Sequence, residues 1–284
     1  MRPDLFDMHC HLGFCADAAR AARELAAVGV GAFSNTVTPG EFAAQREALA
    51  GAGNVRVGVG LHPWWVGERG SGAPAVAGDS ESSGAAASQA NLQLLIAAGN
   101  LEPLRELVAR NRFIGEVGLD FSPRRAATRE AQLQAFEAVA AACAHAGGKV
   151  LSVHAVHAVD DALDVLERAG AVAAAAGNVC IVHWFSGTSD QLTRARRAGC
   201  YFSVNPRMLQ SKRGRAYAQA IPVDRLLLET DQPAEQGAPW DAANIRSQLD
   251  KTLRQLATLR GADPAALRNR IAETSLNLLQ MPSA

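Results

Sequence analysis

The sequence predicts an α/β fold of a single kind, a closed (β/α)8 TIM barrel. Eight short runs of apolar residues follow one another along the chain, each compact enough to be a buried strand. Each run is followed by a longer segment rich in Ala, Leu and Arg with a helical period, and this alternation implies βαβ units around a parallel sheet. A chain of 284 residues is a length that single α/β barrels routinely reach. A doubly wound open sheet is the competing topology.

The candidate strands share short length and a high content of Val, Ile, Leu and Phe. Because they are apolar along their whole length, they fit a parallel sheet that is covered on both faces. In chain order they cover residues 5–8, 31–36, 55–60, 113–117, 150–153, 179–182, 201–204 and 226–228.

The candidate helices lie between these strands, and the last one follows the eighth strand unit. Eight strands that are each followed by a helix predict one barrel domain over residues 1–284. The helical segments cover residues 17–28, 40–51, 91–110, 128–147, 158–170, 189–198, 212–220, 241–260 and 264–279.

One segment, residues 67–90, departs from this alternation. It reads GERGSGAPAVAGDSESSGAAASQA and consists almost entirely of Gly, Ser, Ala and charged residues. This low complexity predicts a flexible insertion in the barrel. A lid beside the third strand is one interpretation, and a neutral spacer is the favoured one.

Charge and hydropathy exclude some classes of protein. With 28 Lys and Arg against 28 Asp and Glu, the formal net charge is zero, so the global basic field of a non-specific nucleic-acid binder is absent. No stretch approaches the ~20 apolar residues of a membrane span. The start, MRPDLFDMHCH, has no long apolar core that would indicate a secretory signal. We therefore expect a cytoplasmic protein that does not bind membranes.

The first strand ends in a His-Cys-His motif. Side chains on a strand alternate between its faces, so His9, His11 and Asp7 are expected to point the same way and Cys10 the opposite way. Neutral imidazole nitrogens suit divalent metals. Alone, this motif is a weak signal for a metal site.

Further ligand-type residues fall at the carboxyl ends of other candidate strands. A barrel gathers all of these ends on one face, which holds the active site in characterised barrel enzymes. Burying several histidines and carboxylates there without a metal would be costly. Together with His9 and His11, the set comprises Glu116, His154, His183 and Asp231.

Six such groups exceed the needs of one four-coordinate ion, and they suggest two divalent ions. Glu116 is the expected bridging carboxylate. His9, His11 and Asp231 are expected to hold one of the ions.

The second ion is expected to bind Glu116, His154 and His183. Metal ions lower the pKa of bound water from about 15.7 toward 7, so a hydroxide nucleophile becomes available. Asp231 is the expected proton acceptor, and Asp231 and Glu116 are the predicted catalytic residues.

Six motifs in this order resemble the TatD-type metal-dependent deoxyribonucleases within the metallo-dependent hydrolase, or amidohydrolase-like, barrels. The resemblance extends over nearly the whole chain. The motifs are FDMHCHLGF at the start, GLHP at 60–63, IGEVGLDFS at 114–122, HWFSGT at 183–188, YFSVNPRM at 201–208 and LLLETDQP at 226–233.

The resemblance implies a two-metal hydrolase that cleaves phosphodiester bonds of DNA or RNA, as a 3′–5′ exonuclease that uses Mg²⁺, Mn²⁺ or zinc. The family's metal ligands match the same six positions already singled out. After His154 this chain has Ala-Val-His-Ala in place of the usual Ser-Arg-Asp-Ala, so an Arg suited to phosphate is lost.

Other residues could restore contacts to the substrate. His62 of GLHP could touch a phosphate, with a supporting structural role as an equal alternative. Arg207 is the best candidate among loop cations on the expected catalytic face. The tryptophans near strand ends, Trp64, Trp65 and Trp184, could stack on a base, although packing at the barrel rim is the favoured role.

Two other functions remain open from the sequence. The same metal centre could hydrolyse an amide or ester, as in a D-aminoacyl-tRNA deacylase. A catalytically silent accessory subunit is the alternative from a different class. For the leading function the expected partner is DNA or RNA, and the expected state is a monomer or weak oligomer.

Overall fold

The computed structural model describes residues 2–66 and 99–281. Eight parallel strands form one sheet, and each strand pairs with the next strand in the chain. All eight strands predicted from the sequence are confirmed. They are β1 (Leu5–Cys10), β2 (Val30–Asn35), β3 (Val55–Leu61), β4 (Phe113–Asp120), β5 (Val150–Val156), β6 (Val179–His183), β7 (Tyr201–Val204) and β8 (Leu226–Leu228).

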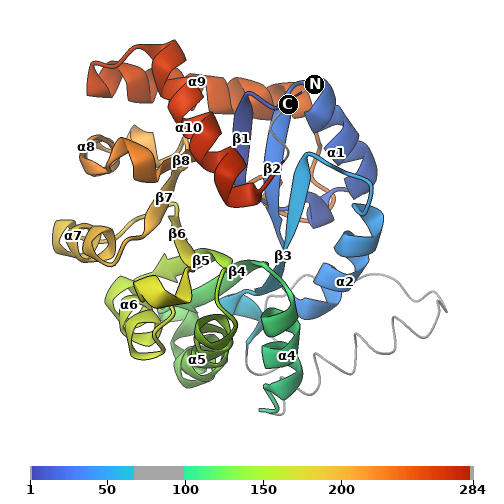
Figure 1. Ribbon diagram of the computed structural model, residues 1–284, viewed down its shortest axis with the longest axis vertical. Helices are drawn as coiled ribbons and strands as arrows, with labels where there is room; N and C mark the ends of the chain where they lie inside the picture. Colours follow the sequence, from blue (N-terminus) through green and yellow to red (C-terminus); the bar gives the residue numbers. More distant parts are fainter. Residues whose placement is uncertain (1, 67–98, 282–284) are drawn as a thin grey trace.

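Helices surround the strands as an outer ring (Figure 1). The predicted segment 91–110 appears as α4, while residues 91–98 and the predicted insertion at 67–90 lie outside the described residues. No helix in the described ranges is long and apolar enough to cross a membrane. The helices are α1 (Ala18–Ala27), α2 (Pro39–Ala48), α4 (Glu102–Arg110), α5 (Arg129–Ala146), α6 (Val159–Arg168), α7 (Ser189–Arg197), α8 (Lys212–Ala220), α9 (Ala242–Arg260) and α10 (Pro264–Leu279).

Side-chain caps explain why several helices begin where they do. The Asp17 carboxylate accepts a hydrogen bond from the backbone N–H of Arg20 at the start of α1. Thr188 and Gln191 form a reciprocal capping box at the start of α7. Such bonds satisfy backbone donors that have no partner within the helix. The helix starts are therefore set by local sequence.

The first and last strands are joined, which closes the sheet into a barrel. The backbone N–H of Asp231 donates to His9 O at 2.9 Å, and the N–H of His11 donates to Gln232 O at 2.9 Å. These bonds and the sequential strand order exclude the open, doubly wound alternative. The predicted TIM barrel is confirmed.

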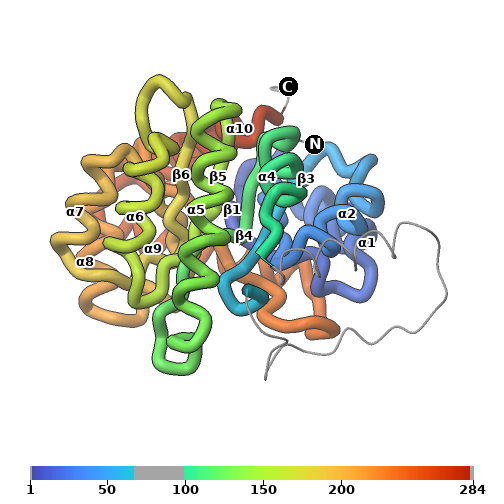
Figure 2. Tube along the Cα trace, turned by 90° about the horizontal axis from the view of Figure 1, so that it is seen from below, coloured from blue at the N-terminus to red at the C-terminus, as the bar shows by residue number. Residues whose placement is uncertain are grey.

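The interior of the barrel has an apolar half and a polar half. Helix α10 contacts β1 and β8 and covers the end at which the strands begin (Figure 2). A larger cluster of apolar residues packs between the sheet and the outer helices. The apolar half of the interior consists of Phe6, Met8, Phe33, Val150, Ile181 and Leu227, packed against α10 residues such as Leu276 and Leu279.

Register shifts interrupt the strands near their carboxyl ends. In β1 the shift falls between Asp7 and Cys10. Phe6 and Met8 belong to the apolar cluster inside the barrel, whereas beyond the shift His9 and Cys10 have exchanged faces relative to a regular strand. A one-residue slip moves side chains to the opposite face of a sheet. The shift therefore turns the histidines toward the interior.

Candidate metal centre

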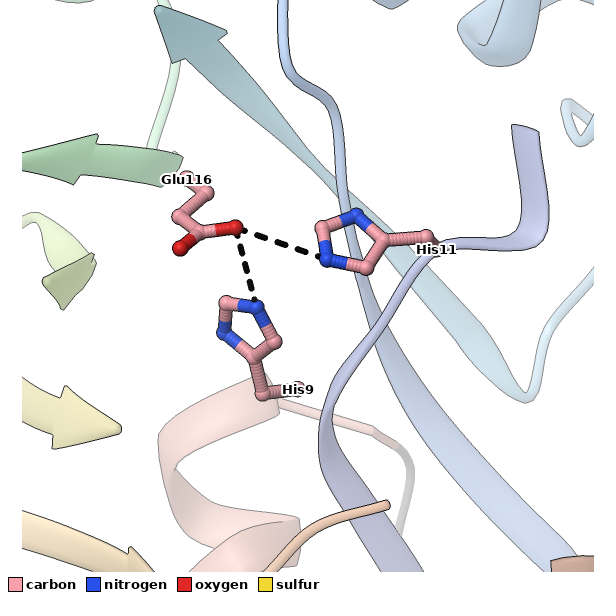
Figure 3. Close-up of side chains that lie close together, drawn as sticks. All are labelled: His9, His11 and Glu116. Carbon is pink, nitrogen blue, oxygen red and sulfur yellow. Dashed lines mark ion pairs between the residues drawn. The ribbon is translucent and has the colours of Figure 1, made fainter. Parts of the chain in front are cut away.

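Glu116 lies at the centre of the polar half of the barrel. Strand β4 carries it, and its carboxylate is buried among histidines that come from four other segments. Figure 3 shows one oxygen of the carboxylate directed at the imidazole rings of both His9 and His11. The other five predicted ligands lie around this carboxylate, so the structure brings together the residues that the sequence singled out.

One oxygen of Glu116 faces the residues of the first strand. Glu116 Oε2 is 3.3 Å from His9 Nε2 and 3.4 Å from His11 Nε2. Asp231, just after β8, places Oδ1 3.2 Å from His11 Nε2 and 3.6 Å from His9 Nε2. These three residues form the group that was predicted for one ion.

The other oxygen of Glu116 faces a second set of histidines. Glu116 Oε1 is 2.7 Å from His154 Nδ1, 3.0 Å from His183 Nε2 and 3.3 Å from His62 Nε2. The ring of His183 also stacks on that of His9, with centroids 3.9 Å apart. Each carboxylate oxygen therefore serves a different group, as a bridging ligand requires.

Close packing of β2, β3 and β4 brings Glu116 to this position. The backbone N–H of Glu116 donates to Thr36 O at 2.8 Å. A Cβ atom on Gly60 would lie 1.6 Å from the same Thr36 oxygen. Only glycine permits so close an approach between backbones. Gly60 thus allows β3 to pack closely enough for Glu116 to reach its position.

Hydrogen bonds to the far nitrogens decide which imidazoles can act as ligands. His11 Nδ1 lies 3.0 Å from the carbonyl oxygen of Asn35 and must donate to it, so in the neutral ring Nε2 carries the lone pair. His9 Nδ1 lies 2.6 Å from Ser152 Oγ. His62 differs, because its Nδ1 accepts from the Trp64 backbone N–H at 3.1 Å. Neutral His62 therefore has its proton on Nε2 and is a donor toward Glu116.

The carboxylates hold protons on two of the histidines when no metal is bound. Burial alone would lower the pKa of His11, but Asp231 and Glu116 outweigh it and raise that pKa to about 9. Burial opposes protonation of His183 too, yet Glu116 and Glu229 raise its pKa well above the ordinary value. The cluster therefore attracts positive charge.

The pKa values of His62, His9 and Glu116 are all lowered. Burial lowers the pKa of His62 to about 4, so this ring is neutral. Burial and the nearby His183 lower the pKa of His9. For Glu116, burial would raise the pKa, but His62, His9 and His183 lower it well below the usual range. Once His11 and His183 release their protons, a carboxylate among neutral imidazoles is a ready donor set for a divalent cation.

Unpaired buried nitrogens test whether these residues fit a metal. Within the described residues, His9 Nε2, His154 Nε2 and His183 Nδ1 are buried without a hydrogen-bond partner. Such atoms cost free energy unless something coordinates them. Three groups have ligand atoms within 4.8 Å of one another: His9, His11 and Glu116; His9, His183 and Glu229; and His62, Glu116 and His154. The donor set fits metal binding.

Two contacts around the histidines were not predicted from the sequence. Asp120 Oδ2 lies 3.6 Å from His154 Nε2, and Ser152 contacts His9. Burial would raise the pKa of Asp120, but the nearby His154 ring and hydrogen bonds from Trp64 and Ser122 lower it well below its usual value. Asp120 shares strand β4 with Glu116, four residues on, so strand alternation was the available signal.

Asp7 and Glu229 lie behind the cluster. Asp7, which was expected to point with His9 and His11, instead accepts hydrogen bonds from the backbone N–H of Thr230 at 2.9 Å and its hydroxyl at 2.5 Å. The register shift in β1 explains this difference. Glu229 is fully buried, accepts from Ser203 Oγ and lies 3.6 Å from His183 Nδ1.

Two pairs of Arg and Trp lie at the rim of the barrel: Arg207 with Trp184, and Arg125 with Trp64. Arg207, predicted to contact substrate, lies 5.6 Å from the Trp184 ring and makes no ion pair with a carboxylate in the described part of the chain. Trp184 packs against the core, as expected. The same expectation is wrong for Trp64, which is 50% exposed because the short helix Pro63–Trp65 (η2) lifts it out of the core.

Comparison with family models gives one match, described as TatD related DNase, over residues 6–280. A relative from Dickeya dadantii, the 3′-5′ ssDNA/RNA exonuclease TatD, is 33% identical over 181 residues, 59% of this chain and 64% of the relative. Human Deoxyribonuclease TATDN3 is 32% identical over 123 residues, 43% of each chain. The aligned parts thus span less than two thirds of these relatives.

Solved structures share the fold at low sequence identity. The hydrolase TatD family protein from Entamoeba histolytica superposes with a TM-score of 0.70 at 16% identity, over 98% of both chains. An uncharacterized amidohydrolase from Saccharomyces cerevisiae gives a TM-score of 0.69 at 17% identity, over 96% of this chain and 99% of that one. Both are barrels of the amidohydrolase-like kind that the sequence predicts.

Proposed function

The chain belongs to the TatD-related DNase family, and on that premise we propose that it is a metal-dependent nuclease that hydrolyses phosphodiester bonds of single-stranded DNA or RNA from the 3′ end. The names of its relatives support this polarity and these substrates. They favour a phosphodiester over the amide or ester that the sequence alone left open.

The observation that carries the proposal is the division of the site by Glu116. Its two oxygens face separate groups of histidines, at 3.3 and 3.4 Å on one side and at 2.7 and 3.0 Å on the other. This arrangement supports a bridging carboxylate between two divalent ions. A set rich in imidazole favours zinc over magnesium.

The residues that would hold the ions are the six predicted ones: His9, His11 and Asp231 on one side, His154 and His183 on the other, and Glu116 between them. Divalent ions bound there would polarise a phosphoryl oxygen and make a water molecule acidic enough to attack phosphorus.

Asp231 is suited to accept the proton of the attacking water. Its side chain is 25% exposed, whereas those of the other five are at most 10% exposed. Its pKa is lowered, because His11, His9 and His183 outweigh burial, so it is ionised at neutral pH. An ionised carboxylate at the open side of the cluster can act as a general base.

His62 is suited to bind the phosphate as a donor. The Trp64 N–H fixes its tautomer, and its proton on Nε2 points into the cluster at Glu116. Such an N–H group can donate a hydrogen bond to a phosphoryl oxygen that carries developing charge. We assign Arg207 to a backbone phosphate further along the substrate strand, since its charge has no carboxylate partner among the described residues.

The experiment is degradation of 5′- and 3′-labelled single-stranded DNA by metal-stripped protein, with Mg²⁺, Mn²⁺ or Zn²⁺ added back. Asp231→Ala is measured alongside, and Asp224→Ala is the matched control, because Asp224 lies in the turn that precedes β8 at the far end of the barrel. We expect metal-dependent shortening from the 3′ end, lost in Asp231→Ala and kept in Asp224→Ala. Cleavage that survives Asp231→Ala, or no cleavage with any metal, would overturn the proposal.

A further inference from the structure

Trp64 is an exposed aromatic side chain beside the metal centre. Among the described residues, the exposed large hydrophobic side chains are Trp64 at 50% and Val223 at 38%. Val223 lies in the turn before β8, at the opposite end of the barrel. The exposed tryptophan therefore sits at the end that carries the candidate chemistry, where an aromatic face can serve a ligand.

The Trp64 ring is held in a fixed orientation. Its indole Nε1 donates to Asp120 Oδ2 at 2.6 Å, and its backbone N–H donates to His62 Nδ1 at 3.1 Å. The ring meets that of His62 edge to face, with centroids 4.9 Å apart. A surface side chain that is ordered before binding loses little entropy when a ligand packs on it. Trp64 is thus a rigid platform.

The platform lies next to the candidate metal ligands. The Trp64 ring centroid is 6.4 Å from that of His154. Asp120, which holds the indole, is 3.6 Å from His154 Nε2. A base that stacked on Trp64 would therefore belong to a nucleotide adjoining the phosphate at the metal centre.

The charge around the platform suits an anionic strand. The Arg125 guanidinium lies 4.8 Å from the Trp64 ring centroid and makes no ion pair with a carboxylate in the described ranges. Arg129, one turn further on, is paired with Asp161 at 2.9 Å. Arg125 therefore keeps its charge available for a phosphate, while Arg129 does not.

The second Trp and Arg pair at the rim offers no equivalent platform. Trp184 packs against the hydrophobic core, with Arg207 5.6 Å from its ring. A base would have little ring surface to cover there. The difference in exposure singles out Trp64.

We propose that Trp64 stacks on an unpaired base of the substrate, next to the scissile phosphate, and that Arg125 binds the adjoining backbone phosphate. This inference rests on the proposed nuclease function and deepens it. Stacking on an aromatic ring tolerates every base and requires that the base be unpaired, so the subsite selects single strands over duplexes. The subsite does not distinguish one base sequence from another.

The test compares steady-state hydrolysis of single-stranded DNA with that of the same strand lacking its 3′-terminal bases. Trp64→Ala is expected to raise KM for the intact strand about 10-fold, the size of one lost base stack. It should leave KM for the abasic strand unchanged, because no base is there to stack. Trp64→Phe keeps a ring but loses the hydrogen bond to Asp120, so KM should recover while kcat falls. Val223→Ala is the control for truncation of an exposed apolar side chain.

Two results would overturn the stacking role. One is an equal effect of Trp64→Ala on both strands, which would mean that the ring acts only by positioning Asp120. The other is the absence of base-dependent quenching of tryptophan fluorescence when metal-free protein is titrated with oligothymidylate. The titration needs no turnover, so it distinguishes failure of the stacking proposal from failure of the nuclease proposal. Quenching that Trp64→Ala abolishes supports the stacking role even if no strand is cleaved.

Discussion

The two halves of the barrel interior differ in what their side chains do. Where the strands begin, Phe6, Phe33 and Ile181 fill the interior with apolar volume, closed by α10. Where the strands end, His9 and His183 keep buried ring nitrogens that have no hydrogen-bond partner among the described residues. The same strands supply both halves. Stability therefore comes from the first residues of each strand and chemistry from the last ones, so the two should respond to different mutations.

The largest expected effect comes from Glu116→Gln in the polar half. The amide keeps the volume but lacks the charge to bridge two cations, so nuclease activity should fall by at least about 10³-fold. The thermal midpoint of the metal-free protein should change little. Circular dichroism and turnover are measured on one preparation. A variant that loses its fold together with its activity would contradict the separation of stability and chemistry between the two halves.

In the apolar half, Phe33→Ala should have the converse effect. Phe33 is fully buried and meets Phe113 edge to face at 5.7 Å. Removing such a ring costs about 3–5 kcal/mol of unfolding free energy. Urea unfolding should show this loss, whereas kcat of the folded fraction should stay within a few fold of the wild type. Phe33→Leu, which leaves a smaller cavity, should lose less.

Metal binding should stabilise the protein through the polar half alone. At about a hundred times the dissociation constant, a ligand adds about 2.7 kcal/mol. His11, with a pKa of about 9, and His183 must release protons before they can bind a metal. The stabilisation should therefore grow as the pH rises from about 6.5 toward 9.

The metal-free protein should show the opposite trend over the same interval. The raised pKa of His11 contributes stability that is complete below its unfolded value of about 6.5 and is lost as the pH rises through its folded value. Thermal midpoints with and without metal should thus diverge with pH. Parallel curves, or a metal effect that persists in Glu116→Gln, would contradict the assignment of the ligands.

The smallest effect is expected at the apolar end of the barrel surface. Asp4 precedes β1 and pairs with Arg246 at 2.7 Å and with Arg268 at 3.0 Å. The Arg246 hydrogen bond lowers the pKa of Asp4. Because the pair is largely exposed, Asp4→Asn should cost only about 0.5 kcal/mol. That difference should hold above a pH of about 4 and vanish as the pH falls through the folded pKa of Asp4.

Much of this arrangement could be predicted because strand ends in a barrel meet on one face. His154, His183 and Asp231 lie far along the chain from His9. Each of them nevertheless ends or follows an apolar run. The rule that gathers these ends is topological and needs no knowledge of side-chain contacts.

The rest depended on features that alternation along a strand does not reveal. The register shift in β1 separated Asp7 from His9 and His11, and a similar shift lies beside Glu116 in β4. Bulges of this kind re-aim side chains near active sites. The exposure of Trp64 was not predicted, because a short turn after β3 sets it, whereas apolar content alone favours burial.

The hydrogen bonds that close the barrel involve the backbones of candidate ligands. His9 O accepts from Asp231 N, and His11 N donates to Gln232 O, so the seam between β1 and the segment after β8 runs through the candidate metal centre. During synthesis the first histidines emerge long before Asp231, and they lack their partners until the last strand docks. Metal binding by His9, His11 and Asp231 should thus occur only after the last strand has docked. A molecule truncated before β8 would keep most of its sequence but would lack Asp231, so the group of ligands formed by His9, His11 and Asp231 could not be completed.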